Sequence, residues 1–217
     1  MAIVTDIETV AVDGFDIEPV AAPSNYKDPE KIAAYIAQAE AAQREKAALY
    51  PWTSRVVALG TAAGDHDPAV VVITSEAEER ETLTWFWRSI VHEDDARFVR
   101  PLIGFNHRQF DLPVLMARST LLGVPYQPLN LDRYRSPHVD LLDRLTFFGA
   151  VPARSLHWFA RRFGLPVDDT VRGADVARLV AEGDWEAVRA HCASDVQLTR
   201  ALAQRLGVIR GGKVTGD

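Results

Sequence analysis

The order of the predicted elements permits an α/β fold, in which strands form one sheet and helices flank it. Short apolar runs rich in β-branched residues alternate with segments whose apolar residues recur at helical spacing. With 217 residues, of which 47% are hydrophobic and 25% charged, the chain is long enough for one well-buried core. We therefore expect a single domain over residues 1–209.

The first expected strand, Ala2 to Thr9, ends in two carboxylates. Because side chains alternate along a strand, Asp6 and Glu8 share one face, with Cα atoms about 6–7 Å apart, and one metal ion could lie between them. An edge strand with two solvated acids is the commoner meaning of such a pair. The metal site is favoured here because two later carboxylates, Asp111 and Asp195, stand where the local pattern predicts inward positions.

A helical insertion is expected at about residues 28–50. Asp28 followed by Pro29 is typical of an N-cap and a first helical position, and Pro51 ends the pattern. The segment is rich in Ala, Glu, Gln and Lys and carries only a weak apolar stripe. We therefore expect a surface helix packed by one edge, with a flap over a substrate groove as the alternative.

The next elements are a hairpin, a helix and a short strand. Val56–Thr61 and Ala69–Thr74 are apolar runs joined by a loop with turn residues, so together with the first strand they predict a three-stranded meander. From Glu76 to about His92 the apolar residues fall at helical spacing, which predicts a helix packed on the sheet. Phe98–Gly104 is expected as a further strand, with its proline at an edge or an end.

Asp111 follows the strand that ends at Gly104. A helix with apolar residues along one side is expected from about Leu112 to Gly123. Asp111 lies at or near its start, where exposed N–H groups favour a carboxylate. Taken alone, Asp111 has the ordinary interpretation of an N-cap.

The proline-punctuated stretch 125–137 is expected to be a loop. Its Arg133 and Arg135 are candidate phosphate contacts, with solvated charge as the default interpretation. His138 and Asp140 resemble a metal pair, but no third ligand stands nearby in the sequence. We therefore expect them to support the site through hydrogen bonds.

Helices are expected at 155–164, at 175–181 and from about 184 to 206. In the last of these, Asp195 falls on the inward apolar stripe and His191 lies one turn before it. Residues four apart on a helix are neighbours, so the two side chains point at the same place. Because a lone carboxylate on a buried stripe would be costly, Asp195 needs a partner, and a simple His–Asp pair is the alternative to a functional site.

Composition excludes several classes of protein. The single cysteine, Cys192, excludes an internal disulfide framework and a cysteine-based zinc cluster, and it agrees with a reducing compartment. No segment is apolar enough to span a membrane and no signal peptide is apparent, so we expect a cytoplasmic protein without membrane contact. A net charge of −6 argues against a protein that coats nucleic acid, although metal ions on an acidic cluster can still meet phosphate. The tail 210–217 is expected to be disordered.

Three segments together resemble the motifs of the DEDD superfamily of 3′→5′ exonucleases, which have a ribonuclease H-like fold. The segments are Asp6-Ile7-Glu8-Thr9, then Phe105-Asn106 with Phe110-Asp111, and His191-Cys192 with Asp195-Val196. The sequence is most similar to stand-alone relatives of the exonuclease domain of family B DNA polymerases. This resemblance covers nearly the whole chain, and it implies a mixed sheet of about five strands flanked by helices.

The resemblance also implies roles for particular residues. Asp6, Glu8, Asp111 and Asp195 would hold two divalent cations, Mg²⁺ or Mn²⁺, which suit hard carboxylate oxygens. Asp6 would bridge the ions and Asp111 would act partly through water. Substrate contacts are implied for Thr9 and Asn106, which would lie beside the terminal nucleotide, and for Phe110, which would pack the site or flank a base.

The implied reaction is hydrolysis of single-stranded nucleic acid, with DNA favoured, from the 3′ end to nucleoside 5′-monophosphates. Proofreading would need a separate polymerase partner, and a role in repair or end-trimming is equally open. Two alternatives remain at this point: a catalytically silent nucleic-acid-binding or assembly module on the same fold, and an endonuclease of the ribonuclease H type. Ribose 2′-OH contacts leave no clear mark in a sequence, so preference for DNA or RNA is not readable.

His191 departs from the pattern of the superfamily. The polymerase-like branch has tyrosine four residues before the last aspartate, and the histidine branch has histidine five residues before it. His191 combines the identity of one branch with the spacing of the other. One residue on a helix is worth about 100° of rotation, so its geometry should follow the tyrosine branch. Our hypothesis is that His191 orients or deprotonates the attacking water, and the alternatives are that it only positions a metal-activated hydroxide or that the enzyme is impaired.

Overall fold

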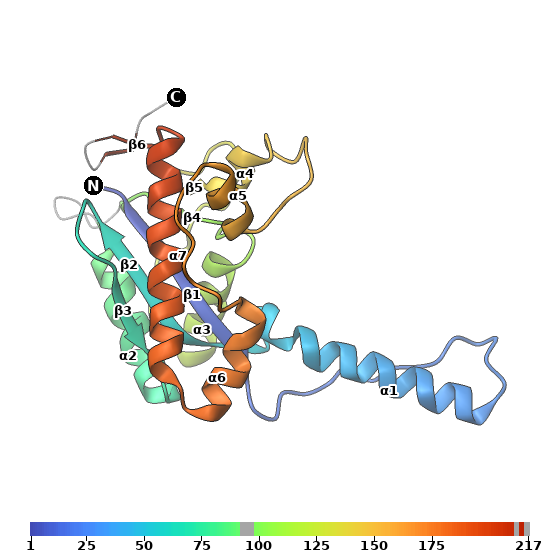
Figure 1. Cartoon of the computed structure of the whole chain (residues 1–217). Helices are drawn as coiled ribbons and strands as arrows, with labels where there is room; N and C mark the ends of the chain where they lie inside the picture. The colour runs from blue at the N-terminus through green and yellow to red at the C-terminus, as the bar shows by residue number, and fades with distance from the viewer. Residues whose placement is uncertain (92–97, 211–212, 215–217) are drawn as a thin grey trace.

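A computed structural model describes residues 1–91, 98–210 and 213–214. Its centre is a five-stranded mixed sheet in the order β3-β2-β1-β4-β5 (Figure 1). The strands are β1 (Ile3–Ala11), β2 (Ser54–Ala63), β3 (Ala69–Val72), β4 (Leu102–Gly104) and β5 (Val139–Asp140). The first three form the expected antiparallel meander, and β4 and β5 continue the sheet in parallel with β1. The predicted mixed α/β sheet is therefore confirmed.

Helices cover both faces of this sheet. One face carries α2 (Glu76–Ser89) and α3 (Asp111–Leu122), and the other carries α4 (Leu141–Leu145), α5 (Leu156–Arg162), α6 (Val176–Glu182) and the long α7 (Trp185–Arg205) (Figure 1). A 3₁₀ turn, η2 (Gly173–Asp175), precedes α6. Side chains alternate along β1, so they point toward the two helical layers in turn. Ile3 and Ile7 pack with α2 and α3, whereas Val4 and Val10 lie on the side of α7.

The close approach of α7 to the sheet depends on Gly60 in β2. A Cβ atom at Gly60 would lie 2.7 Å from Val196 Cγ2 and 2.8 Å from Cys192 Sγ, distances that real side chains do not tolerate. Since α7 also carries His191 and Asp195, this glycine allows both side chains to approach β1.

The α2 and α3 layer is held by a buried ion pair. Arg118 Nε and Nη2 donate to the Glu79 carboxylate at 2.8 and 2.7 Å, and Glu79 Oε1 also accepts the Val56 amide at 2.9 Å. Both charged side chains are almost fully buried. A bidentate pair of this kind joins α2, α3 and β2 in one place.

The insertion between β1 and β2 forms α1 (Pro29–Lys46) and a short 3₁₀ turn, η1 (Ala47–Leu49). Asp28 caps α1 by accepting the Glu30 amide, with Pro29 in the first turn as expected. None of the residues of α1, which the structure describes in full, is buried, and the helix extends away from the domain (Figure 1). Its solvated surface agrees with the weak apolar stripe in its sequence.

Several boundaries differ from those expected. The strand predicted over Phe98–Gly104 forms only at Leu102–Gly104, because Pro101 has no N–H for a ladder bond, and Val99 makes an isolated bridge to Val91. The helix predicted to reach about His92 ends at Ser89, and His92 itself lies outside the described residues. The second hairpin strand ends at Val72, two residues before Thr74.

The C-terminal end lies partly outside the described residues. Two short strands, β6 (Ile209–Arg210) and β7 (Lys213–Val214), pair with each other, while 211–212 and 215–217 are not described. The expected disorder of the tail is therefore wrong for residues 210, 213 and 214, which lie in these strands, and it stays a prediction for the residues that are not described. Among the helices that are described, none has the length and apolar character needed to cross a membrane.

Candidate active site

β1 supplies the first two carboxylates. Asp6 and Glu8 have the parity of Val4, so their side chains lie on the face covered by α7. Glu8 is buried and Asp6 half-buried. The β1–β2 register shifts between Glu8 and Thr9, which marks a bulge directly after the acidic pair. Bulges of this kind re-aim side chains and are frequent beside functional sites.

β4 leads to the third carboxylate. The chain turns sharply after Gly104, where Asn106 adopts a left-handed conformation with φ of 59°. Asp140 fixes this turn because its two oxygens accept the amides of Asn106 and Arg108 at 2.9 and 3.1 Å. Asp111 then becomes the first residue of α3 and is buried. The N-cap position belongs to Phe110, so the ordinary N-cap interpretation of Asp111 does not hold.

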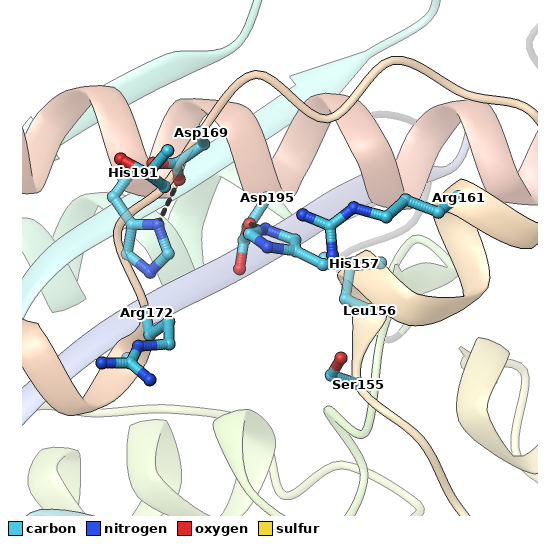
Figure 2. Close-up of a pocket in the computed structure, with 10 residues that line it drawn as sticks. Ser155, Leu156, His157, Arg161, Asp169, Arg172, His191 and Asp195 are labelled. Atoms are coloured by element: carbon cyan, nitrogen blue, oxygen red, sulfur yellow. Dashed lines mark hydrogen bonds and ion pairs between the residues drawn. The ribbon is translucent and has the colours of Figure 1, made fainter.

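α7 supplies the remaining groups. His191 and Asp195 project from one face of the helix toward the end of β1, as the four-residue spacing predicts (Figure 2). Donor atoms of Glu8, His191 and Asp195 all lie within 4.8 Å of one another, and so do those of Asp6, Glu8 and Cys192. Asp111 belongs to neither group, although its negative charge raises the pKa of Asp6.

The four carboxylates form one electrostatic unit. Burial is the main cause that raises the pKa of Asp6, and the charges of Asp111, Glu8 and Asp195 raise it further. Burial likewise raises the pKa of Glu8 to about 8 and that of Asp111 to about 8. Desolvated like charges repel one another, so a site of this kind is suited to bind cations. The donor set of carboxylate oxygens fits Mg²⁺ or Mn²⁺.

His191 is held between two acids. Its Nδ1 lies 2.5 Å from Asp169 Oδ2 (Figure 2). Its Nε2 lies 3.5 Å from Glu8 Oε1. Burial disfavours the imidazolium, but the charge of Glu8 and the hydrogen bond that Nδ1 donates to Asp169 outweigh it, so the pKa of His191 is raised. The ring is almost fully buried and its orientation is fixed from both sides.

A second histidine contacts the cluster from α5. His157 Nε2 lies 3.1 Å from Asp195 Oδ1, and the His157 ring stands nearly perpendicular to that of His191, with centroids 6.5 Å apart. Ser155 caps α5 through the Trp158 amide at 3.2 Å, which sets the first turn of the helix and with it His157.

Asp169 and His157 were not singled out in the sequence. Asp169 lies in the irregular stretch before η2, where no periodic pattern marks it. His157 occupies the non-apolar side of the expected helix, next to its predicted cap, and this position was the only signal available. Their contacts with His191 and Asp195 arise only from tertiary packing.

A hollow of about 550 Å³ opens beside the two histidines (Figure 2). Its lining includes His157, Asp169, His191 and Asp195, together with the guanidinium groups of Arg161 and Arg172. The acidic cluster therefore opens to solvent through a cavity whose rim carries positive charge.

The residues expected to contact substrate have structural roles in the chain itself. The Thr9 hydroxyl donates to the Ala48 carbonyl at 2.7 Å, which ties β1 to η1. The Asn106 carbonyl accepts the amides of Gln109 and Phe110, at 3.1 Å in both cases. Phe110 is partly buried against the apolar cluster that contains α2 and α3. Their contacts with a nucleotide stay predictions.

The expected support residues are found in that role. His138 Nδ1 accepts the Leu102 amide at 3.1 Å, and Asp140 holds the turn before Asp111. Arg133, a candidate phosphate contact, is ion-paired with Asp143 at 3.1 Å, whereas Arg135 is exposed.

Comparisons with known proteins identify a family and a similar fold. Residues 50–215 match a protein family described as predicted 3′-5′ exonuclease related to the exonuclease domain of PolB. The matched stretch contains Asp111, His191 and Asp195, while Asp6 and Glu8 precede it. A search of curated proteins finds no match.

The fold is similar to that of the family B DNA polymerase from the hyperthermophilic archaeon Pyrobaculum calidifontis, with a TM-score of 0.62 and 18% sequence identity. The similarity covers 94% of this chain and 24% of the polymerase chain. The chain thus spans about a quarter of that protein, and at this identity the comparison shows the fold.

Proposed function

Because the chain belongs to the family of predicted 3′-5′ exonucleases related to the exonuclease domain of PolB, we propose that it removes nucleotides from the 3′ end of single-stranded nucleic acid by metal-dependent hydrolysis. DNA is the favoured substrate. The observation that carries this proposal is that three separate elements bring their acids together: ligand atoms of Glu8 lie within 4.8 Å of those of Asp6 and of Asp195, and Asp111 is near enough for its charge to raise the pKa of Asp6.

Asp6, Glu8, Asp111 and Asp195 would hold two divalent cations, Mg²⁺ or Mn²⁺. When bound, such a pair supplies the positive charge that stabilises both the attacking and the leaving oxygen of an in-line displacement at phosphorus. The raised carboxylate pKa values support this assignment, because each carboxylate lacks the solvation that it has in water.

His191 is proposed to orient the attacking water and to accept its proton once cations bound to Glu8 offset the negative charge that raises the pKa of the ring. Nδ1 of His191 is hydrogen-bonded to Asp169, and so Nε2 is the nitrogen that faces Glu8 and the other acids. Catalytic bases are commonly oriented by a third group, and Asp169 would have that role for His191. His157 has a different role: its bond to Asp195 holds that carboxylate in place.

The proposed reaction is balanced by water alone. Its oxygen forms a bond to the terminal phosphorus, and the bond from phosphorus to the 3′ oxygen of the preceding nucleotide breaks. The proton removed from water leaves through His191, and the 3′ oxygen takes up a proton. The products are a nucleoside 5′-monophosphate and a strand shorter by one nucleotide.

The deciding experiment is degradation of 3′-labelled single-stranded DNA and RNA oligonucleotides with Mg²⁺, Mn²⁺ or a chelator. We expect release of labelled mononucleotide with either metal, no release with the chelator, and none from Asp6→Ala. A circular single-stranded substrate must stay intact, because an exonuclease needs an end. Cleavage of the circle would instead indicate an endonuclease, and absence of both hydrolysis and metal binding would indicate a silent module.

A further inference from the structure

An exposed aromatic and arginine surface lies outside the acidic site. It is formed by Tyr134 in the loop before β5, by Phe147 and Phe148 in the turn after α4, and by the nearby Arg133 and Arg144. We name it the aromatic surface. Phe147 is 71% exposed and Tyr134 is 78% exposed, values unusual for large rings in a folded domain.

The turn that carries these rings adopts a disfavoured backbone. Phe147 has φ of 51° and Phe148 has φ of 59°, both in the left-handed region that side chains other than glycine rarely adopt. Hydrogen bonds hold the turn in place: the Phe148 amide donates to the Asp143 carbonyl at 2.6 Å and the Val151 amide donates to the Thr146 carbonyl at 3.1 Å. Because Phe147 gains little burial from this conformation, folding does not explain it, and functional surfaces are where such conformations gather.

The rings and the arginines are arranged as a unit. The rings of Tyr134 and Phe148 lie 5.6 Å apart, and the Arg144 guanidinium lies 5.7 Å from the Phe148 centroid. Arg133 donates to the Phe148 carbonyl at 2.8 Å and is ion-paired with Asp143. A hollow of about 130 Å³ opens beside them, and Arg108, Arg133 and Arg144 are among its lining residues.

The local charge opposes that of the whole chain. The net charge of the protein is −6, yet residues 132–154 contain four arginines and only three acids. Two of these acids, Asp140 and Asp143, are buried, and the third is Asp132. Exposed rings interleaved with arginines on an otherwise acidic protein match the chemistry of single-stranded nucleic acid, whose bases stack on aromatic rings and whose phosphates pair with guanidinium groups.

The aromatic surface is fixed relative to the acidic site. Asp140 caps α4 by accepting the Leu142 amide at 2.9 Å, and the same carboxylate accepts the Asn106 and Arg108 amides in the turn that leads to Asp111. Arg108 is in turn ion-paired with Asp143 of α4. The chain after the surface continues through residues 149–154 into α5 (Figure 1). His157 of α5 contacts Asp195. A nucleic acid strand bound at the aromatic surface would therefore lie at a fixed position relative to the acidic site.

We propose that the aromatic surface binds the unpaired strand upstream of the 3′ end, with a base stacked on Phe147 and phosphates paired with the neighbouring arginines. This inference rests on the proposed function for the position of the 3′ end. The surface itself binds single strands whether or not hydrolysis occurs.

The test compares wild type with Phe147→Ala and Phe147→Trp. Affinity for fluorescein-labelled oligothymidylates of five and fifteen nucleotides is measured by fluorescence anisotropy in EDTA, where metal-dependent hydrolysis cannot proceed. We expect Phe147→Ala to weaken binding of the longer strand about tenfold, the effect of losing one base stack, and Phe147→Trp to retain it. Trp85→Ala, which removes an exposed ring from α2 on the opposite layer, serves as the matched control and should bind as wild type.

Hydrolysis separates this inference from the proposed function. With Mn²⁺, Phe147→Ala should cleave a dinucleotide at the wild-type rate and the fifteen-nucleotide strand several-fold more slowly at subsaturating concentration. If no variant hydrolyses anything but the Phe147 dependence of binding persists, the aromatic surface stands and the proposed function fails. The inference would be overturned if wild type and Phe147→Ala bound each of the two oligothymidylates with the same affinity. The aromatic surface would then be a candidate contact for a protein partner.

Discussion

Asp169 and His191 are joined by a hydrogen bond of 2.5 Å between Oδ2 and Nδ1. The two residues are 22 positions apart in the chain, and the bond leaves Nε2 of the same ring facing Glu8. His191 lies four residues before Asp195 on α7, so the two side chains share one face of the helix. Asp169 is the group that fixes the ring in this setting.

Removing Asp169 should lower the turnover number more than it changes KM. Asp169→Ala frees the His191 ring, and loss of such an orienting partner typically costs about 10–100-fold in activity. Steady-state kinetics on a short oligonucleotide measures both parameters. Asp168→Ala, which removes the exposed neighbouring carboxylate, is the matched control and should behave as wild type. Equal turnover in the two variants would contradict the role of Asp169.

His191→Ala and His191→Tyr separate the possible roles of the imidazole. General acid–base groups contribute about 10²–10⁴-fold to rate, so His191→Ala should lose activity in that range. His191→Tyr restores the residue that the polymerase-like branch has at this spacing, and it should recover part of the loss. Single-turnover rates with Mg²⁺ and Mn²⁺ are the measurement. If His191→Ala is as fast as wild type, the base role is wrong.

Asp111→Asn should stabilise the metal-free protein while it abolishes activity. Burial raises the pKa of Asp111 to about 8, so at pH above that value the folded protein carries the ionised carboxylate together with the full cost of its desolvation. Removing this charge relieves both desolvation and repulsion within the cluster. Thermal unfolding in EDTA at pH 8.5 should show a higher Tm for the variant. Mg²⁺ should raise the Tm of wild type more than that of Asp111→Asn, and a lower Tm for the variant in EDTA would contradict the electrostatic account.

Glu79→Ala should destabilise the fold strongly. It leaves the buried Arg118 guanidinium unpaired and removes the acceptor of the Val56 amide. Breaking one side of a buried pair typically costs about 3–5 kcal/mol. Urea unfolding measures the loss, and Glu76→Ala, which breaks an exposed pair with Arg80 on the same helix, should cost less than about 1 kcal/mol.

Acid should destabilise the protein through His107. Burial lowers its pKa from 6.5 to about 3, and among the described residues neither ring nitrogen has a hydrogen-bond partner. Below pH 6.5 the unfolded chain therefore binds a proton that the folded chain does not, and stability is lost as pH falls toward 3. The difference in unfolding free energy between wild type and His107→Gln should change by about 1.4 kcal/mol per pH unit in this window.

The pH dependence is measured by urea unfolding between pH 7.5 and 4.5. The variant comparison is needed because the acidic cluster changes the unfolding free energy in the opposite direction. Its raised pKa values stabilise the folded state as pH falls. His66→Gln, at an exposed position, is the matched control for the exchange of histidine for glutamine. A difference between wild type and His107→Gln that does not vary with pH would show that His107 does not titrate in this range.

Local periodicity accounts for the parts of the site that could be predicted. Asp6 and Glu8 share a face because strand side chains alternate, and His191 and Asp195 share one because helix side chains recur every four residues. The caps of α1 and α5 were also readable, since Asp28 and Ser155 satisfy amides within their own first turns. The short β4 and the early end of α2 were missed because Pro101 and local pairing decide boundaries that periodicity leaves open.

Strand and helix periodicity indicates which faces of single elements carry the acids, and the three motifs indicate the family. How those faces meet depends on long-range packing. The absence of a Cβ at Gly60 lets α7 approach the sheet, and the turn held by Asp140 orients the segment that carries Asp111. Asp169 and His157 joined the site in the same way. Their contacts span 22 and 38 residues, and spacing rules that reach one helical turn or one strand repeat carry no information over such separations.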